Sequence, residues 1–166
     1  MLKINKLSLF FIGVISMLFS CTTTSKKEEN TATTSEKTEE KYDWTDCQNC
    51  GMPTNDFPNW QVMLQANSAT IAFCAPRCMM IHLADSSNNI ANSIEKMEVT
   101  DYYTTQKIDG KTAFYVTGSD KTSPMGKDFV PFSTKEEAEN FMTEHNGKKI
   151  YSFEEINKDV VVLELK

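Results

Sequence analysis

The stretch WQVMLQANSATIAFCAPRCMMIHLAD, residues 60–85, contains two strand patterns followed by a helix pattern. Residues 60–66 and 70–73 carry the apolar and β-branched side chains of strands, and Asn67-Ser68 between them is a turn signal. Pro76 is tolerated in the first turn of a helix, which we expect to run to about Asp85. Residues 96–103, KMEVTDYY, predict a third strand. This part of the chain therefore has the order strand, strand, helix, strand.

The C-terminal part repeats this order of elements. Asp109-Gly110 is a turn signal, and strands are expected at 112–117 and 129–132, with Pro131 marking an edge strand. Ser133-Thr-Lys-Glu136 has the spacing of a capping box, which opens a helix with Ala138, Phe141 and Met142 on its apolar face. Gly147 stands where a left-handed C-cap residue is expected, and residues 149–153 predict a last strand. The sequence predicts an α+β fold of two small strand-strand-helix-strand units, residues 43–105 and 106–166.

The N-terminus has the features of an export signal. Lys3 and Lys6 precede an apolar run from Leu7 to Phe19, which is short for a membrane span. The run ends in Leu18-Phe19-Ser20-Cys21, which resembles the bacterial lipobox, in which the cysteine is lipidated and becomes the mature N-terminus. We expect residues 1–20 to be a lipoprotein signal peptide and Cys21 to anchor the chain to a membrane outside the cytoplasm. A cleaved signal followed by an unmodified cysteine is the alternative.

Residues 21–42 have the composition of a tether. After Cys21 they are mostly Thr, Ser, Lys and Glu without large aliphatic side chains, and such segments bury too little apolar surface to fold. The whole chain has a formal net charge of −6 and no basic stripe, which argues against binding to nucleic acid.

The remaining cysteines form two close pairs, one C-x2-C and one C-x3-C: Cys47, Cys50, Cys74 and Cys78. Such pairs are typical of a metal site or of a disulfide framework. A thioredoxin-like redox pair is a poor fit, because the first pair follows a polar segment and precedes Gly51 and Pro53 rather than a helix. Oxidation of the thiols to disulfides in an oxidising compartment stays open.

The second pair is followed by a histidine at helical spacing. Cys78 and His82 lie four residues apart, so on a helix they share one face and could ligate one ion. His82 is equally compatible with a partly exposed helix histidine. Met79 and Met80 beside them are candidates for core packing.

The chemical softness of the candidate ligands indicates which metal ion the site would bind. Four cysteines at these spacings are typical of zinc, which is the strongest competitor. Methionine beside cysteine favours copper(I), because thioether sulfur suits a soft ion. In Cys50-Gly51-Met52, the glycine permits a tight turn that lets the thiolate and the thioether face one ion.

Four segments together resemble the NosL family of nitrous oxide reductase accessory lipoproteins: CQNCGM at 47–52, VTDYYT at 99–104, AFYVTGSD at 113–120 and SPMGKDFVPFSTKEEAENFMTEHNGKKIYSF at 123–153. The likeness runs from Cys47 to about Ile156. It implies a protein that binds copper(I) and delivers it to nitrous oxide reductase outside the cytoplasm, working with a dedicated ABC transporter complex. The family's CGM motif corresponds to Cys50, Gly51 and Met52.

The family's PMG motif corresponds to Pro124, Met125 and Gly126. Met125 lies in a loop bounded by Gly and Pro, and its mobile thioether is a candidate third ligand that could close over copper held by Cys50 and Met52. The chain departs from the commoner family pattern at Cys74 and Cys78, which look like the cysteines of TRASH-type metal-binding modules. Both a Cys/Met site and a cysteine-rich site are therefore open.

The sequence thus predicts a membrane-tethered, extracytoplasmic copper(I)-binding chaperone rather than an enzyme. The chain shows no Ser/His/Asp arrangement and no phosphate-binding glycine loop. Two alternatives are retained: a zinc-binding structural or adaptor lipoprotein, and a periplasmic thiol-disulfide protein.

Overall fold

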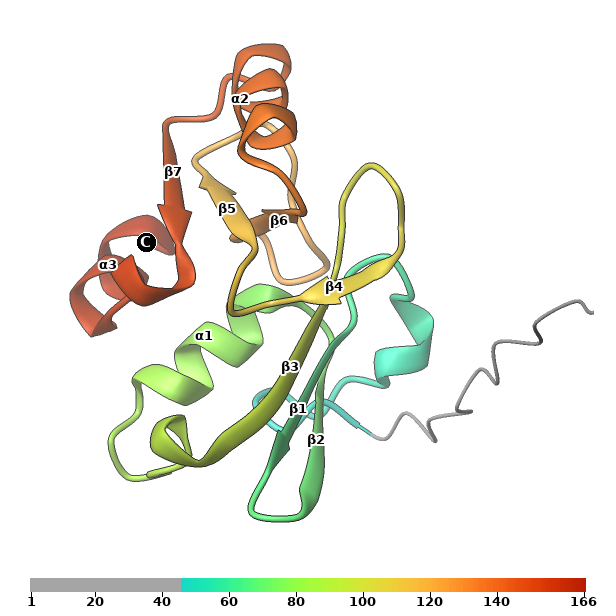
Figure 1. Cartoon of the computed structure of the whole chain (residues 1–166), viewed down its shortest axis with the longest axis vertical. Helices are drawn as coiled ribbons and strands as arrows, with labels where there is room; N and C mark the ends of the chain where they lie inside the picture. The colour runs from blue at the N-terminus through green and yellow to red at the C-terminus, as the bar shows by residue number, and fades with distance from the viewer. Residues whose placement is uncertain (1–45) are drawn as a thin grey trace, which may run out of the picture. The chain divides into compact units, whose positions relative to one another are not determined.

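Two antiparallel sheets and three α-helices form an α+β fold, described for residues 46–166 in the computed structural model shown in Figure 1. The α+β prediction is confirmed, and each half of the chain contains the expected order strand, strand, helix, strand. The signal peptide, the lipidated Cys21 and the tether that the sequence predicts lie outside the described residues.

The first sheet has the strand order β2-β1-β3-β4. Its strands are β1 (Val62–Ala66), β2 (Ala69–Phe73), β3 (Ile94–Thr100) and β4 (Lys107–Asp109). The two-residue turn between β1 and β2 has φ of 50° at Asn67 and 62° at Ser68, the conformation that matches the twist of a tight hairpin. Helix α1 (Pro76–Ala84) follows β2 directly and packs its buried side against this sheet.

The second sheet has the order β6-β5-β7 and carries helix α2 (Lys135–Glu144). Its strands are β5 (Phe114–Thr117), β6 (Val130–Phe132) and β7 (Lys149–Ser152). Pro131 lies in β6, an edge strand as predicted, where a residue without N–H interrupts no central ladder. Phe141 of α2 packs with Phe132 of β6 in a small cluster of its own.

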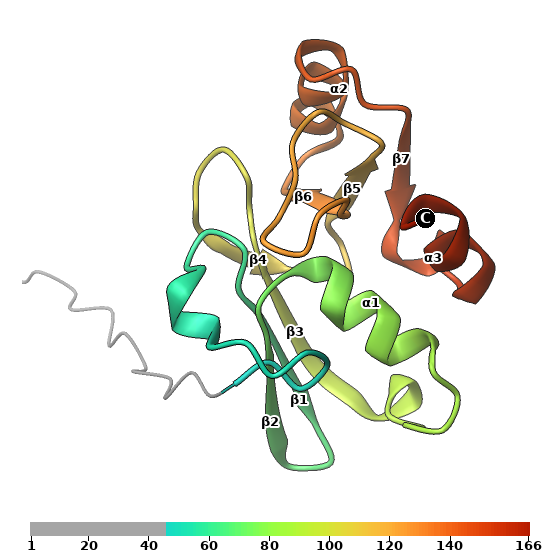
Figure 2. The same ribbon diagram turned by 180° about the vertical axis from the view of Figure 1, so that it is seen from behind.

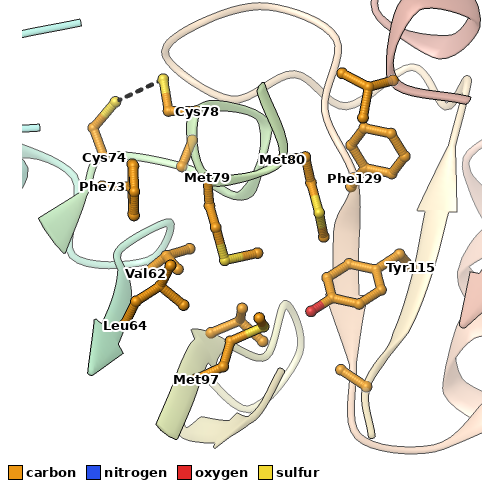
Figure 3. Packing of buried hydrophobic residues seen from close by; sticks show 14 of the residues in the cluster. Val62, Leu64, Phe73, Cys74, Cys78, Met79, Met80, Met97, Tyr115 and Phe129 are labelled. Atoms are coloured by element: carbon orange, nitrogen blue, oxygen red, sulfur yellow. Dashed lines mark hydrogen bonds between the residues drawn. The ribbon is translucent and has the colours of Figure 1, made fainter. Parts of the chain in front are cut away.

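One main core joins the two halves of the described chain. Figure 3 shows Met79 and Met80 extending from α1 towards Met97 of β3, Tyr115 of β5 and Phe129, and all five side chains are buried. Both methionines of α1 are thus core residues. The core extends to Val161 of helix α3 (Lys158–Glu164), which lies beside α1 in both views of the chain (Figures 1 and 2).

Two predicted helix-end signals are shifted by one residue. The capping box of α2 is formed by Thr134 and Glu137, not by Ser133 and Glu136, because Thr134 is the residue with extended backbone whose side chain accepts from the Glu137 N–H. At the other end Asn146, with φ of 54°, takes the left-handed position expected for Gly147. Gly147 is needed for space instead, since a Cβ there would lie 2.7 Å from Val116.

The strand prediction for 96–103 is too long at its C-terminal end. The backbone N–H groups of Tyr103 and Thr104 donate to the Asp101 carboxylate at 3.1 and 2.8 Å, so a side chain takes over as acceptor where the strand would have continued. The chain then returns as β4, which the sequence did not predict. Strand β4 pairs with β3 although it follows residue 105, the expected end of the first unit.

Helix α3 was also not predicted. Its run of valines has low helix propensity, and the signals that form the helix are the Asn157 side chain, which accepts from two backbone N–H groups, and burial of Val161. Three short 3-10 turns complete the described chain: Thr54–Asp56, Ala91–Ser93 and Phe153–Glu155.

Candidate metal centre

The first cysteine pair lies in a closed loop at residues 47–52. The Cys47 N–H donates to the Met52 carbonyl at 2.8 Å, and the Gly51 N–H donates to the Cys47 carbonyl at 2.8 Å. Gly51 has φ of 74°, which a side chain would strain, so the tight turn predicted at this glycine is present. This hydrogen-bonded loop carries both Cys47 and Cys50.

The second pair lies where β2 passes into α1. Cys74 follows the last residue of β2, and Cys78 stands in the first turn of the helix that begins at Pro76. The Gln48 N–H donates to the Ala72 carbonyl at 3.0 Å, which fixes the 47–52 loop to the end of β2. This backbone bond brings the two cysteine pairs together.

All four thiols meet in one group, in which the sulfur atoms of Cys47, Cys50, Cys74 and Cys78 lie within 4.8 Å of one another. The sulfur atoms of Cys50 and Cys74 are 3.5 Å apart, and those of Cys74 and Cys78 are 3.7 Å apart. None of these cysteines is in a disulfide. Three are buried and Cys50 is half-buried, so Cys50 is the thiol nearest to solvent.

The pKa values of the thiols in this group differ strongly from one another. A hydrogen bond from the Cys78 thiol, against the opposing effect of burial, lowers the pKa of Cys47 to about 4. Burial, together with the neighbouring Cys50 and the Cys47 charge, raises the pKa of Cys74 to about 12. The pKa of Cys78 is raised as well, first because its thiol donates to Cys47. The surroundings therefore favour a thiolate on Cys47 beside protonated thiols on Cys74 and Cys78, and this negative charge would attract a cation.

His82 is not brought into the thiol group. Its ring packs against Phe73 with 5.2 Å between ring centroids, and its Nδ1 lies 3.3 Å from Asn88 Nδ2. Burial lowers the pKa of His82. Although His82 and Cys78 are four residues apart on α1, Cys78 directs its sulfur towards Cys74 (Figure 3).

Met52 and Met125 both lie beside the core that contains the cysteines. Each is half-buried and packs against that core. Met125 stands in a tight turn in which Ser123 and Gly126 exchange backbone hydrogen bonds of 2.9 and 3.0 Å. Its neighbour Gly126 has φ of 94°. The PMG segment, which the sequence predicted as a loop bounded by Gly and Pro, is therefore a hydrogen-bonded turn.

The donor set fits a soft or borderline metal ion. Four thiol sulfurs from two short-spaced pairs can close a tetrahedron around zinc, and two or three of them satisfy copper(I). The carboxylates that calcium or magnesium requires are absent from this group of described side chains.

The sequence profile of the NosL family matches residues 40–161. The chain belongs to the NosL family. The match covers both cysteine pairs and the turn of Met125. A comparison with curated proteins found no match.

A solved NosL structure supports the assignment. The crystal structure of the copper chaperone NosL from Shewanella denitrificans is 27% identical to this chain, with a TM-score of 0.62. The alignment covers 69% of this chain and 90% of that chain. Among residues 46–166 of the NosL chain described here, none of the helices has the length and apolar character needed to cross a membrane.

Proposed function

We propose that the chain is a copper(I) chaperone held at a membrane outside the cytoplasm, which delivers copper for the maturation of nitrous oxide reductase. The observation that carries the proposal is the convergence of four reduced thiols, three of them buried, within 4.8 Å. Membership of the NosL family and the copper chaperone from Shewanella denitrificans support copper as the cargo.

The protonation of the site suits a carrier. The Cys47 thiolate would favour copper(I) in the group, and binding would displace protons from the thiols whose pKa is raised. Protons returning to these thiols would favour release. Cys50 is the most exposed of the four, so it is the sulfur that a partner's ligand can reach. These steps bind and release a metal ion, and we assign no catalytic residue.

Delivery and attachment rest on the family and on the N-terminal sequence. We propose nitrous oxide reductase and its dedicated ABC transporter complex as partners because the chain belongs to the NosL family. The lipobox-like Leu18-Phe19-Ser20-Cys21 supports attachment through lipid on Cys21.

A zinc-binding structural or adaptor role is the second candidate. The observation in its favour is the tetrathiol group itself, which is the donor set of structural zinc sites. Native mass spectrometry of the full chain in detergent, offered copper(I) and zinc together under a strict reductant, separates the two. We expect the copper(I) complex to dominate. Exclusive zinc loading would overturn the copper proposal, and a protein that takes neither metal but forms disulfides would favour the thiol-disulfide alternative.

The delivery step needs a separate experiment. In cells that lack the chain, nitrous oxide reductase should be made with little copper, and wild-type protein should restore its copper content. Cys50→Ser should not restore it. A fully copper-loaded reductase in cells without the chain would contradict the proposed partner while leaving copper binding intact.

A further inference from the structure

Asp128 is a buried carboxyl group in the segment that joins the Met125 turn to β6. Asp128 is only 4% exposed to solvent. One oxygen, Oδ1, accepts from the Phe129 N–H at 2.7 Å and from the Arg77 N–H at 2.6 Å. The other oxygen, Oδ2, has no hydrogen-bond partner. Burying a carboxyl oxygen without a partner is costly, so the position calls for an explanation beyond packing.

The bond to Arg77 caps helix α1 from a distant part of the chain. The N-cap residue of α1 is Ala75, which has no side chain able to accept from the first turn. Asp128 supplies the missing acceptor although it lies 51 positions from Arg77. Arg77 directly precedes Cys78, so the cap fixes the turn of helix that presents this cysteine to the thiol group.

A second hydrogen bond connects the same two segments, residues 127–128 and the start of α1. The Arg77 guanidinium donates from Nη1 to the Lys127 carbonyl at 3.0 Å. Arg77 of α1 thus binds Lys127 through its side chain and Asp128 through its backbone N–H. Because two bonds of different direction meet at Arg77, the segment after Met125 is held against the start of α1 in one orientation.

Asp128 follows Met125 by three residues. Within the Met125 turn the Ser123 hydroxyl donates to the Gly126 carbonyl at 3.4 Å. The same Ser123 hydroxyl accepts from the Met125 N–H at 3.1 Å. The Met125 turn is thus closed by its own hydrogen bonds, and Asp128, three residues after Met125, ties the chain that leaves this turn to the Arg77 N–H.

We propose that Asp128 is a positioning residue that holds the Met125 turn against the first turn of α1 and so fixes the Met125 sulfur relative to Cys78. This inference rests on the proposed function and on the family's PMG motif, which makes Met125 a candidate third ligand of copper(I). The consequence is kinetic: Asp128 holds the Met125 turn against the core that contains the thiols, and this slows the loss of copper. Burial also raises the pKa of Asp128 to about 7, and its protonated form keeps Oδ1 as an acceptor for Arg77.

A double-mutant cycle tests the coupling. The full chain, purified in detergent and loaded with copper(I), is mixed with an excess of a coloured copper(I) chelator such as bathocuproine disulfonate, and the transfer rate is measured. Asp128→Ala and Met125→Leu should each speed transfer about tenfold, the factor equivalent to 1.4 kcal/mol. The double variant should be no faster than Met125→Leu, because without the thioether nothing remains for Asp128 to position.

Two further variants separate positioning from general destabilisation. Asp128→Asn keeps an acceptor oxygen for Arg77 and should transfer copper within about twofold of wild type. Asp101→Asn is the matched control, since Asp101 is also buried and accepts from the N–H of Ser133, 32 positions away in the chain. It should lower stability without changing the transfer rate.

Several outcomes would overturn the inference. Additive effects of Asp128→Ala and Met125→Leu, or an Asp128→Ala rate within about twofold of wild type, would show that Asp128 does not act through Met125. A silent Met125→Leu would remove the inference but leave copper binding by the cysteines, whereas a wild-type protein that takes up no copper(I) would remove the proposed function too. If Asp128→Ala does not fold, Arg77→Ala removes the guanidinium bond to the Lys127 carbonyl in the same contact and must give the same non-additivity with Met125→Leu.

Discussion

The sulfur atoms of Cys50 and Cys74 lie 3.5 Å apart although the residues are 24 positions apart in the chain. Cys50 belongs to the closed 47–52 loop, and Cys74 stands at the end of β2. This contact joins the C-x2-C pair to the C-x3-C pair, and it makes the two pairs one site. It also places two thiols from different pairs close enough to react with each other.

The first prediction concerns oxidation of this pair. A disulfide requires sulfur atoms about 2.05 Å apart, so Cys50 and Cys74 need to approach by about 1.5 Å. Treatment of the metal-free chain with diamide should therefore form a Cys50–Cys74 disulfide and abolish copper(I) uptake. Peptide mass mapping without reduction checks the pairing. Prior loading with copper(I) should protect both thiols, and equal oxidation of the loaded and metal-free forms would contradict a site at these cysteines.

The second prediction distinguishes the two candidate ligand sets. Cys50→Ser should lose copper(I) almost completely, because it removes a sulfur that supplies charge and bonding. Met52→Leu and Met125→Leu should weaken copper(I) binding by a smaller factor, and the packing cost should stay below about 1.5 kcal/mol because Leu and Met have similar volumes. Competitive copper(I) titration under strict reductant measures all three affinities.

A structural zinc site would give a different pattern in the same titrations. Both methionine changes would be silent, and Ser substitution at Cys47, Cys50, Cys74 or Cys78 would be equally damaging. Thermal unfolding of each variant provides the control, since a methionine variant that loses stability cannot report on ligation alone.

The third prediction concerns the anchor. If Cys21 carries lipid, Cys21→Ser should release the exported chain from the membrane fraction, because the buried acyl methylenes that hold it are absent. Copper(I) binding should be unchanged, since the proposed ligands all lie in residues 46–166. Fractionation of cells followed by metal titration of the released protein checks both parts. Loss of copper from this variant would mean that Cys21 is itself a ligand.

The fourth prediction is that titration of Asp128 makes the stability of the fold depend on pH. Its pKa is raised to about 7 in the folded chain, chiefly by burial, from an ordinary value near 3.9. A group whose pKa is higher in the folded than in the unfolded state contributes its full stabilisation at pH values below the unfolded-state pKa. This contribution is lost as the pH rises to the folded-state pKa. Between about pH 4 and pH 7 the wild-type chain should therefore lose on the order of 4 kcal/mol from this group.

Asp128→Asn should remove this component of the pH dependence, because an amide does not titrate in this range. Urea unfolding of both chains in the metal-free state at several pH values compares the two slopes. Parallel slopes for wild type and Asp128→Asn would show that Asp128 is ionised in the folded chain with an ordinary pKa.

The sequence alone determined the order of most elements. Alternating apolar residues, Asn67-Ser68 and Pro76 act within a few positions of themselves, so they predicted the β1–β2 hairpin and α1 without knowledge of the rest of the chain. The same locality explains the one-residue error at Thr134, since Ser133 and Thr134 can both cap a helix and only the folded backbone selects between them. Cysteine spacing likewise singled out the two pairs as candidate metal ligands.

Only the tertiary structure decided how these parts meet. The bond from Gln48 to Ala72 brings the cysteine pairs together, and the packing of His82 on Phe73 keeps that side chain out of the group. Strand β4 exists because β3 offers it an edge, and Asp128 caps a helix that begins 52 positions earlier, at Pro76. Contacts of this kind join residues that are distant in sequence, and no local pattern of hydrophobicity or spacing encodes which distant residue will be the partner.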